Sequence, residues 1–144
     1  TRIDLVREQI CVAHGDKIFT TQENVKPLGH SIECRINAEN SVDFKPSAGT
    51  IGLFHPPAGN GIRLDTFIYS GYKVPHYYDN LLAKLIATGR TRNHAIKRAL
   101  RSLNEIVIDG IETNIELHKK ILSSKDFKNG AVSINWLENN IASL

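Results

Sequence analysis

The sequence has 144 residues, of which 41% are hydrophobic and 23% are charged, the balance of an ordinary globular domain. A chain of this length buries about 68–70% of the surface that its unfolded form exposes, so it can form a real core. No apolar run approaches the roughly 20 residues that cross a bilayer, and two cysteines make neither a disulfide framework nor a metal cluster.

Charge and the first residues set expectations about location and partners. The start, Thr1-Arg2-Ile3-Asp4, lacks the basic-then-apolar pattern of a secretion signal, so we expect a reducing, cytoplasmic location without membrane contact. The net charge is +3, and basic residues gather only between Arg90 and Arg101. That segment could face nucleic-acid phosphates, but a solvated helix face is the commoner explanation, so we expect no nucleic-acid partner.

The first predicted element is a helix over Thr1–Ala13. Ile3, Val6 and Ile10 form one apolar stripe, Thr1 and Asp4 have capping-box spacing, and Gly15 marks the stop. A helix that begins at the first residue is expected to have packed on a preceding part of a longer chain. The next segment is polar and then turn-like. We therefore expect residues 1–26 to be a terminal helix and linker, and residues 27–144 to be the main domain.

The part that follows is rich in predicted strands, separated by clusters of Pro, Gly, Asn and Ser. These clusters favour antiparallel hairpins, and Asn60-Gly61 suits the tight end of one. The predicted strands are His30–Ala38, Gly49–Phe54, Ile62–Ile68 and Asn80–Thr88.

Helices dominate the rest of the predicted structure. Thr91 caps a helix that runs to about Val107, and Thr113 with Glu116 forms a capping box for a helix through Ile121. A last short helix covers about Ile134–Ile141. Strands followed by helices, without regular βαβ alternation, predict an α+β fold in which C-terminal helices pack on a hairpin-rich antiparallel sheet.

The most informative segment for chemistry is the first predicted strand. Alternate side chains of a strand point to opposite faces, which predicts an apolar face that includes Cys34 and a polar face with Glu33, Arg35, Asn37 and Glu39. A guanidinium held between carboxylates and an amide can donate to an oxygen that develops negative charge. The alternative is a solvated Glu/Arg ladder, and Cys34 is more simply a core residue than a nucleophile.

Other candidate groups are fewer. Asp79 follows a Pro-His-Tyr-Tyr turn and could orient an arginine, or it could simply cap the turn. The six histidines show no ligand spacing, so we predict no protein-bound metal. Neither a glycine-rich phosphate loop before a helix nor a nucleophile elbow is present, so the chain holds no complete catalytic apparatus.

Seven runs of sequence, in their order and spacing, resemble the biotin carboxylase family, and most closely the subunit of bacterial and plastid acetyl-CoA carboxylases. The resemblance covers nearly the whole chain, with departures at Ala58, Asn60 and His76 that bear on dimerisation. The matching runs are residues 29–39, 44–49, 61–65, 69–75, 77–79, 84–86 and 108–114.

The resemblance implies a ligase in which ATP and Mg²⁺ activate bicarbonate and CO₂ passes to biotin on the biotin carboxyl carrier protein, in fatty acid synthesis. It places Arg35 opposite the ureido oxygen of biotin. The polar strand face and the turn add Glu33, Asn37 and Asp79 as supporting or substrate-binding candidates. The family's ATP-grasp groups have no counterpart in this sequence and are implied to lie upstream. The resemblance thus implies that the chain alone is inactive and binds none of these cofactors tightly.

Two further positions are carried over from the family. Ile134 matches a residue that packs against the adenine of ATP, and Arg63 matches an arginine at a homodimer interface. The same resemblance extends to the equivalent region of propionyl-CoA, methylcrotonyl-CoA and pyruvate carboxylases, which remain alternatives. A non-catalytic interaction module or a weak nucleic-acid binder is the alternative from another class.

Overall fold

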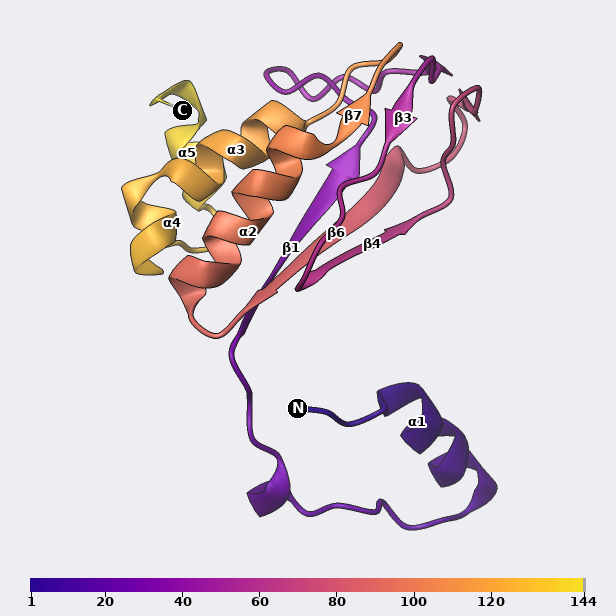
Figure 1. Ribbon diagram of the computed structural model, residues 1–144, viewed down its shortest axis with the longest axis vertical. Coiled ribbons are helices and arrows are strands. Elements are labelled where there is room, and N and C mark those ends of the chain that lie inside the picture. The colour runs from indigo at the N-terminus through magenta and orange to yellow at the C-terminus, as the bar shows by residue number, and fades with distance from the viewer. Residues whose placement is uncertain (144) are drawn as a thin grey trace.

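The computed structural model describes residues 1–143 and combines helices with antiparallel strands (Figure 1). Leu144, the last residue of the predicted main domain, lies outside the described residues. Its largest sheet has the order β1-β6-β4, formed by β1 (His30–Asn37), β6 (Leu81–Gly89) and β4 (Ile62–Thr66). Two smaller pairs join β2 (Gly49–Thr50) to β5 (Lys73–Val74), and β3 (Phe54–His55) to β7 (Val107–Ile108). All these pairs are antiparallel, which confirms the predicted α+β class.

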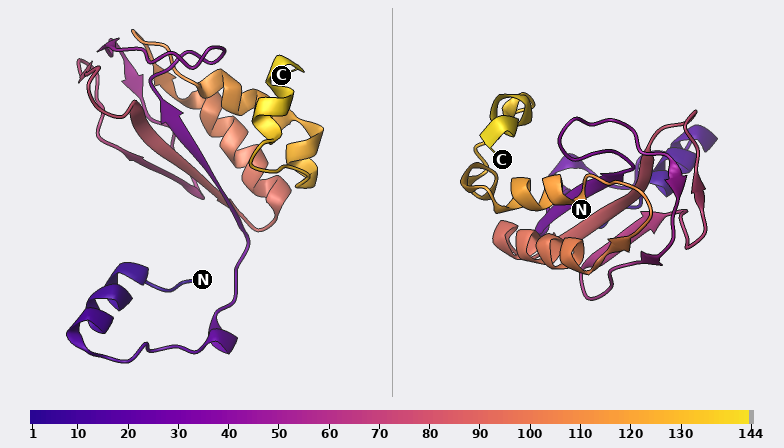
Figure 2. Two further views of the ribbon diagram at one scale, coloured as in Figure 1. Left: turned by 180° about the vertical axis from the view of Figure 1, so that it is seen from behind. Right: turned by 90° about the horizontal axis from the view of Figure 1, so that it is seen from above.

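Helices cover one face of the large sheet. Helix α2 (Arg92–Glu105) packs across β6 and β1, and α3 (Ile115–Ser123) packs beside α2 and also contacts β1. Figures 1 and 2 show both helices on the same side of the sheet. The chain ends in α4 (Lys125–Asn129), α5 (Trp136–Asn140) and a 3-10 turn, Ile141–Ser143, while another 3-10 turn, Gln22–Asn24, precedes β1.

Strict alternation along β1 creates the core. Ile32, Cys34 and Ile36 are buried against the helices, and the residues between them face away. Cys34 pairs with Leu85 of β6, whose side chain is fully buried. Burying one such large apolar side chain stabilises the fold by about 1.5–3 kcal/mol. The sheet is therefore held by its helix-covered face, which leaves the other face open.

Helix α1 (Leu5–His14) lies apart from this core (Figures 1 and 2). It buries none of its side chains, and Leu5, Val6 and Ile10 are each about two-thirds exposed. The prediction that this helix begins at Thr1 is wrong, because the Asp4 carboxylate caps it by accepting from the backbone N–H of Arg7 at 3.0 Å. Gly15 ends it in the left-handed conformation, as its position suggested.

Two predicted strand features differ from the structure. The strand expected over Gly49–Phe54 is two short strands, since β2 pairs with β5 whereas β3 pairs with the distant β7. Asn60-Gly61 does not close a hairpin, because β3 and β4 are not paired with each other. Both predictions are wrong because the strands pair with segments distant in the sequence, which the local turn residues do not indicate.

The helix boundaries differ for similar reasons. Helix α2 ends at Glu105 instead of Val107, because Ile106 is extended and Val107 joins β7. Asn114 occupies the N-cap position of helix α3 without forming a side-chain capping bond, and the predicted capping box of Thr113 with Glu116 does not form. The segment expected to end that helix also begins another, since the Ser124 hydroxyl caps α4.

The basic segment on α2 is used inside the fold. Arg92 donates from Nε and Nη2 to the Phe127 carbonyl, at 3.2 and 2.6 Å. Arg98 and Arg101 likewise donate to backbone carbonyls, those of Thr88 and Ala58. These contacts give the three arginines a structural role. No helix in residues 1–143 has the length and apolarity needed to cross a membrane.

Candidate functional site

Arg35 lies in the middle of β1, on the open face of the sheet. Its neighbour Cys34 is buried on the helix side, so the exposed Arg35 side chain points the other way. Lys84 on β6 is its cross-strand partner, and Asp65 on β4 is the partner of Lys84, so the three form one row. Within residues 1–143, the Arg35 guanidinium forms no hydrogen bond or ion pair, so its donors are available to a ligand.

The backbone beneath Arg35 is held firmly, although its side chain is not. β1 is an edge strand, and Asn114 closes its outer edge. The Asn114 side chain accepts from the Asn37 N–H at 3.0 Å and donates to the Arg35 carbonyl at 3.2 Å. Nε2 of His118 lies 2.9 Å from the same Arg35 carbonyl. Since a carbonyl can only accept, this distance assigns the proton to Nε2.

Glu39 is the centre of a second set of contacts at the end of β1. Its Oε1 accepts from the side-chain amides of Asn37 at 3.2 Å and Asn114 at 2.9 Å, and its Oε2 accepts from Asn80 at 2.8 Å. Three amides thus hold one carboxylate. The Asn37 side chain binds Glu39 and not Arg35, and its own Oδ1 is buried with no hydrogen-bond partner among the described residues.

Glu33 and Cys34 occupy opposite faces of the same strand. Glu33 is exposed and makes no ion pair within residues 1–143, so it does not flank Arg35 as a bonded partner. Burial, with a smaller contribution from the Glu33 charge, raises the pKa of the Cys34 thiol to about 12. Cys34 is therefore an unreactive core residue, in agreement with its expected role.

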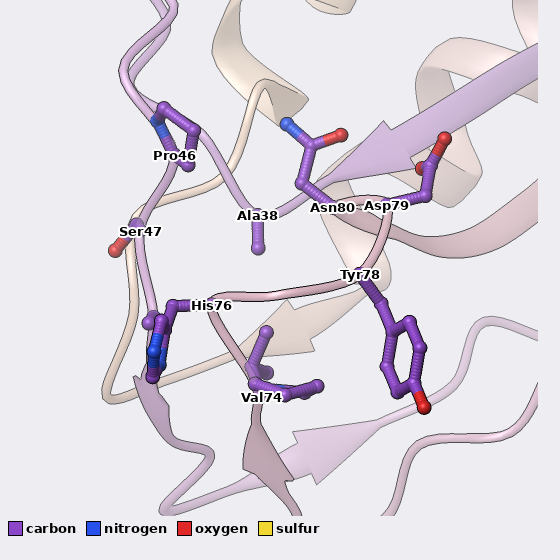
Figure 3. A pocket seen from close by; sticks show the side chains of 10 residues that line it. Ala38, Pro46, Ser47, Val74, His76, Tyr78, Asp79 and Asn80 are labelled. Atoms are coloured by element: carbon purple, nitrogen blue, oxygen red, sulfur yellow. The ribbon is translucent and has the colours of Figure 1, made fainter.

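Asp79 lies beside a cavity of about 340 Å³ at the end of β1 (Figure 3). Its Oδ1 accepts from the backbone N–H of Leu81 at 2.7 Å, which is the turn-capping alternative raised by the sequence. Figure 3 shows Asp79 and Asn80 at one end of the cavity and His76 at the other. Within residues 1–143 Asp79 forms no hydrogen bond or ion pair with an arginine, so an orienting role toward Arg35 remains a prediction.

The other two predicted site residues lie on separate elements. Arg63 is on β4, and its Nε forms an exposed ion pair with Asp65 Oδ1 at 3.2 Å. It shares the open sheet face with Arg35, because its cross-strand partner Ile86 is also the partner of Glu33. Ile134 lies between α4 and α5 and is 97% exposed. No three His, Cys, Asp or Glu side chains in residues 1–143 are grouped to hold a metal ion.

Sequence reasoning missed the residues that fix the backbone of Arg35. Asn114 and His118 are 79 and 83 positions away from it, so no local pattern connects them. The only available signal was misleading, because Asn114 stands within the predicted capping box. Its side chain is committed to β1 and makes no capping bond to its own helix.

The family of the chain follows from comparison with known proteins. The family model described as the biotin carboxylase C-terminal domain matches residues 33–139. The chain belongs to this family. Biotin carboxylase from Pseudomonas aeruginosa is 46% identical over 138 residues, which cover 96% of this chain and 31% of that protein. The chain thus spans about a third of the length of the curated relatives that it matches.

Solved structures extend the likeness to other carboxylases. The biotin carboxylase domain dimer of Hydrogenobacter thermophilus 2-oxoglutarate carboxylase, in complex with MgADP, ADP and bicarbonate, is 39% identical with a TM-score of 0.91. The match covers 98% of this chain and 31% of that one. A complete multifunctional pyruvate carboxylase from Rhizobium etli is 32% identical with a TM-score of 0.93, over 99% of this chain and 14% of that one.

Proposed function

We propose that this chain is the biotin-facing region of an ATP-dependent biotin carboxylase, with Arg35 as the residue that contacts biotin. One observation carries the proposal: the Arg35 guanidinium is exposed and unpartnered, while the backbone that bears it is fixed by Asn114 and His118. A solvated ladder arginine would not need that support. Family membership supplies the substrate, since the relatives are biotin carboxylases.

The proposed role of Arg35 follows from charge. Biotin must lose a proton from its ureido nitrogen before that nitrogen can accept CO₂, and negative charge then develops on the ureido oxygen. A guanidinium N–H aimed at this oxygen stabilises the charge without reorganisation at the moment of reaction. Lys84, the cross-strand partner of Arg35, adds positive charge to the same part of the open face. Glu33, Asn37 and Asp79 would support the position of biotin or of Arg35.

ATP and Mg²⁺ enter the proposal through the rest of the enzyme. The exposed Ile134 fits an adenine ring, because an apolar side chain that is 97% exposed gains by being covered. The described residues do not fit Mg²⁺, since they offer no group of three possible ligands. We therefore assign the phosphate and metal groups to an ATP-grasp part of the enzyme outside this chain, and expect the chain alone to be inactive.

The apolar side of α1 gives this missing part a place to bind. Leu5, Val6 and Ile10 expose an apolar stripe that the main domain does not cover. Residues 1–26 would thus be the terminal helix and linker of the ATP-grasp part, as the sequence suggested. The biotin carboxyl carrier protein would bring biotin to the open sheet face, and Arg63 would lie at a homodimer contact on the same face.

We place the holoenzyme among cytoplasmic acetyl-CoA carboxylases of fatty acid synthesis, on the sequence resemblance alone. Relatives that carboxylate pyruvate or 2-oxoglutarate share this region, so the final acceptor must be selected elsewhere in each enzyme. Propionyl-CoA, methylcrotonyl-CoA and pyruvate carboxylases remain the alternatives.

The test is the variant Arg35→Gln in the full-length enzyme that contains this region. Its rate of biotin carboxylation should fall by about 10²- to 10³-fold, the usual cost of removing one preorganised donor to an oxyanion. ATP binding and the melting temperature should change little, because the side chain is exposed and off the core. Lys97→Gln, which removes an exposed positive charge from α2, is the matched control. Normal turnover by Arg35→Gln would refute the proposal.

A further inference from the structure

We infer that Asn114 and His118 are positioning residues for Arg35, and that they set its direction through the backbone of β1. The inference rests on the proposed function, because it assigns a purpose to the support beneath the proposed biotin contact. Neither residue forms a hydrogen bond with the Arg35 guanidinium. Both form a hydrogen bond with the Arg35 backbone carbonyl. They lie at the N-terminal end of α3, about 80 positions after Arg35 in the sequence.

Asn114 acts as a substitute for a neighbouring strand. On the free edge of a strand, the C=O of one residue and the N–H two residues later point outward together. Here these are the Arg35 carbonyl and the Asn37 N–H, and one side-chain amide satisfies both. The backbone N–H of Asn114 also donates to the Asn37 carbonyl, at 3.3 Å. Three bonds from one residue thus close the edge at the place where the guanidinium leaves the strand.

His118 adds a second donor to the Arg35 carbonyl. It lies four residues after Asn114, on the same side of α3, so the two side chains reach β1 together. A carbonyl oxygen has two lone pairs, and here Asn114 and His118 take one each. Burial lowers the pKa of His118, and this effect exceeds the opposite effects of its bond to the Arg35 carbonyl and of the charge of Glu39.

The Asn114 side chain is itself held in one position. Asn114 is only 5% exposed, and its Nδ2 also donates to Glu39, which Asn37 and Asn80 hold from other directions. The β1 edge therefore has one defined position relative to α3. A catalytic group moved by about 1 Å can lose up to about 100-fold in rate, so a loose edge at Arg35 would be costly to the reaction.

The experiment uses the full-length enzyme and the variants Asn114→Ala, His118→Leu and His118→Gln. Asn114→Ala and His118→Leu should lower kcat for biotin carboxylation by up to about 100-fold. The KM for ATP should not change, because the positioned group faces biotin. His118→Gln keeps an amide donor in reach of the carbonyl and should restore most of the rate. Ile96→Val removes one buried methyl group from α2, which makes no hydrogen bond to Asn114, His118 or the Arg35 carbonyl, and should leave kcat unchanged.

Combination with Arg35→Gln gives the decisive measurement. If Asn114 and His118 act through Arg35, the double variants should be no slower than Arg35→Gln alone. Rate losses that multiply would overturn the inference, as would normal turnover of Asn114→Ala and His118→Leu beside a slow Arg35→Gln. If Arg35→Gln itself turns over normally, the proposed function fails first. Should Asn114→Ala not fold, the two His118 variants decide the question by rescue.

Discussion

The two cysteines should react with thiol reagents at very different rates in the folded chain. Cys34 is 2% exposed, and its pKa is raised from the usual 9.0 to about 12, mainly by burial. Because the thiolate is the reactive form, a shift from 9.0 to about 12 lowers its population near pH 8 by about 1000-fold. Cys11, by contrast, is half-exposed on α1.

The assay is alkylation with iodoacetamide at pH 8, followed by mass spectrometry of the peptides that contain each cysteine. Cys11 should be alkylated in the native chain while Cys34 stays unmodified, and both should react readily in denaturant. Cys34 reaches the reagent only after β1 separates from β6 and α2. Its slow native rate therefore measures the free energy of that opening, which for core strands approaches the global value.

Control variants sharpen the measurement. Cys11→Ser leaves a single thiol, so slow loss of signal can be assigned to Cys34 without peptide mapping. Glu33→Gln should change the rate only slightly, because the charge of Glu33 is the smaller cause of the pKa shift. Modification of Cys34 at a rate near that of Cys11 in the native chain would refute the packing of β1 described above.

Two further predictions concern stability. The lowered pKa of His118 means that the unfolded chain binds its proton more readily, so the free energy of unfolding should fall as pH drops below about 6.5. Above that pH the contribution of His118 to the free energy of unfolding no longer changes. The variant His118→Gln should therefore lose this pH dependence in urea titrations. Arg92→Ala should lower the free energy of unfolding by about 2 kcal/mol, since a charged double hydrogen bond and a cation–π contact with Phe127 are lost. A change within about 0.5 kcal/mol, the range of ordinary surface substitutions, would contradict the role given to Arg92.

The elements that the sequence predicted well are those whose signals are local. Alternation along β1 and the helical spacing along α2 depend on neighbouring residues, and the Thr91 side chain does cap α2 by accepting from the His94 N–H. Errors appear where two local signals compete. Thr1 and Asp4 could both cap the first helix, and only the backbone shows that Arg2, with φ of 62°, lies outside it.

In the candidate site, too, local patterns predicted one residue and missed those that depend on long-range contacts. Arg35 could be placed on the polar face of its strand from alternation, and its role came from the family resemblance. Its supports could not be found, because the contacts of Asn114 and His118 join residues 77 to 83 positions apart. A side-chain amide can cap its own helix or bind a distant strand, and only tertiary packing decides which. The Asn114 side chain binds β1, because unpaired backbone groups on that edge would cost more free energy than an uncapped helix N-terminus.

The exposed apolar side chains of α1 and Ile134 also support the proposed function. Helix α1 has ten residues, and a helix of that length is marginal in water unless its apolar stripe is packed. That stripe is exposed, as is the side chain of Ile134 beyond α4. A closed domain would be expected to bury such groups, as it does along β1, β6 and α2. Their exposure is accounted for if they meet the ATP-grasp part and the adenine ring, which is the arrangement that the proposed function requires.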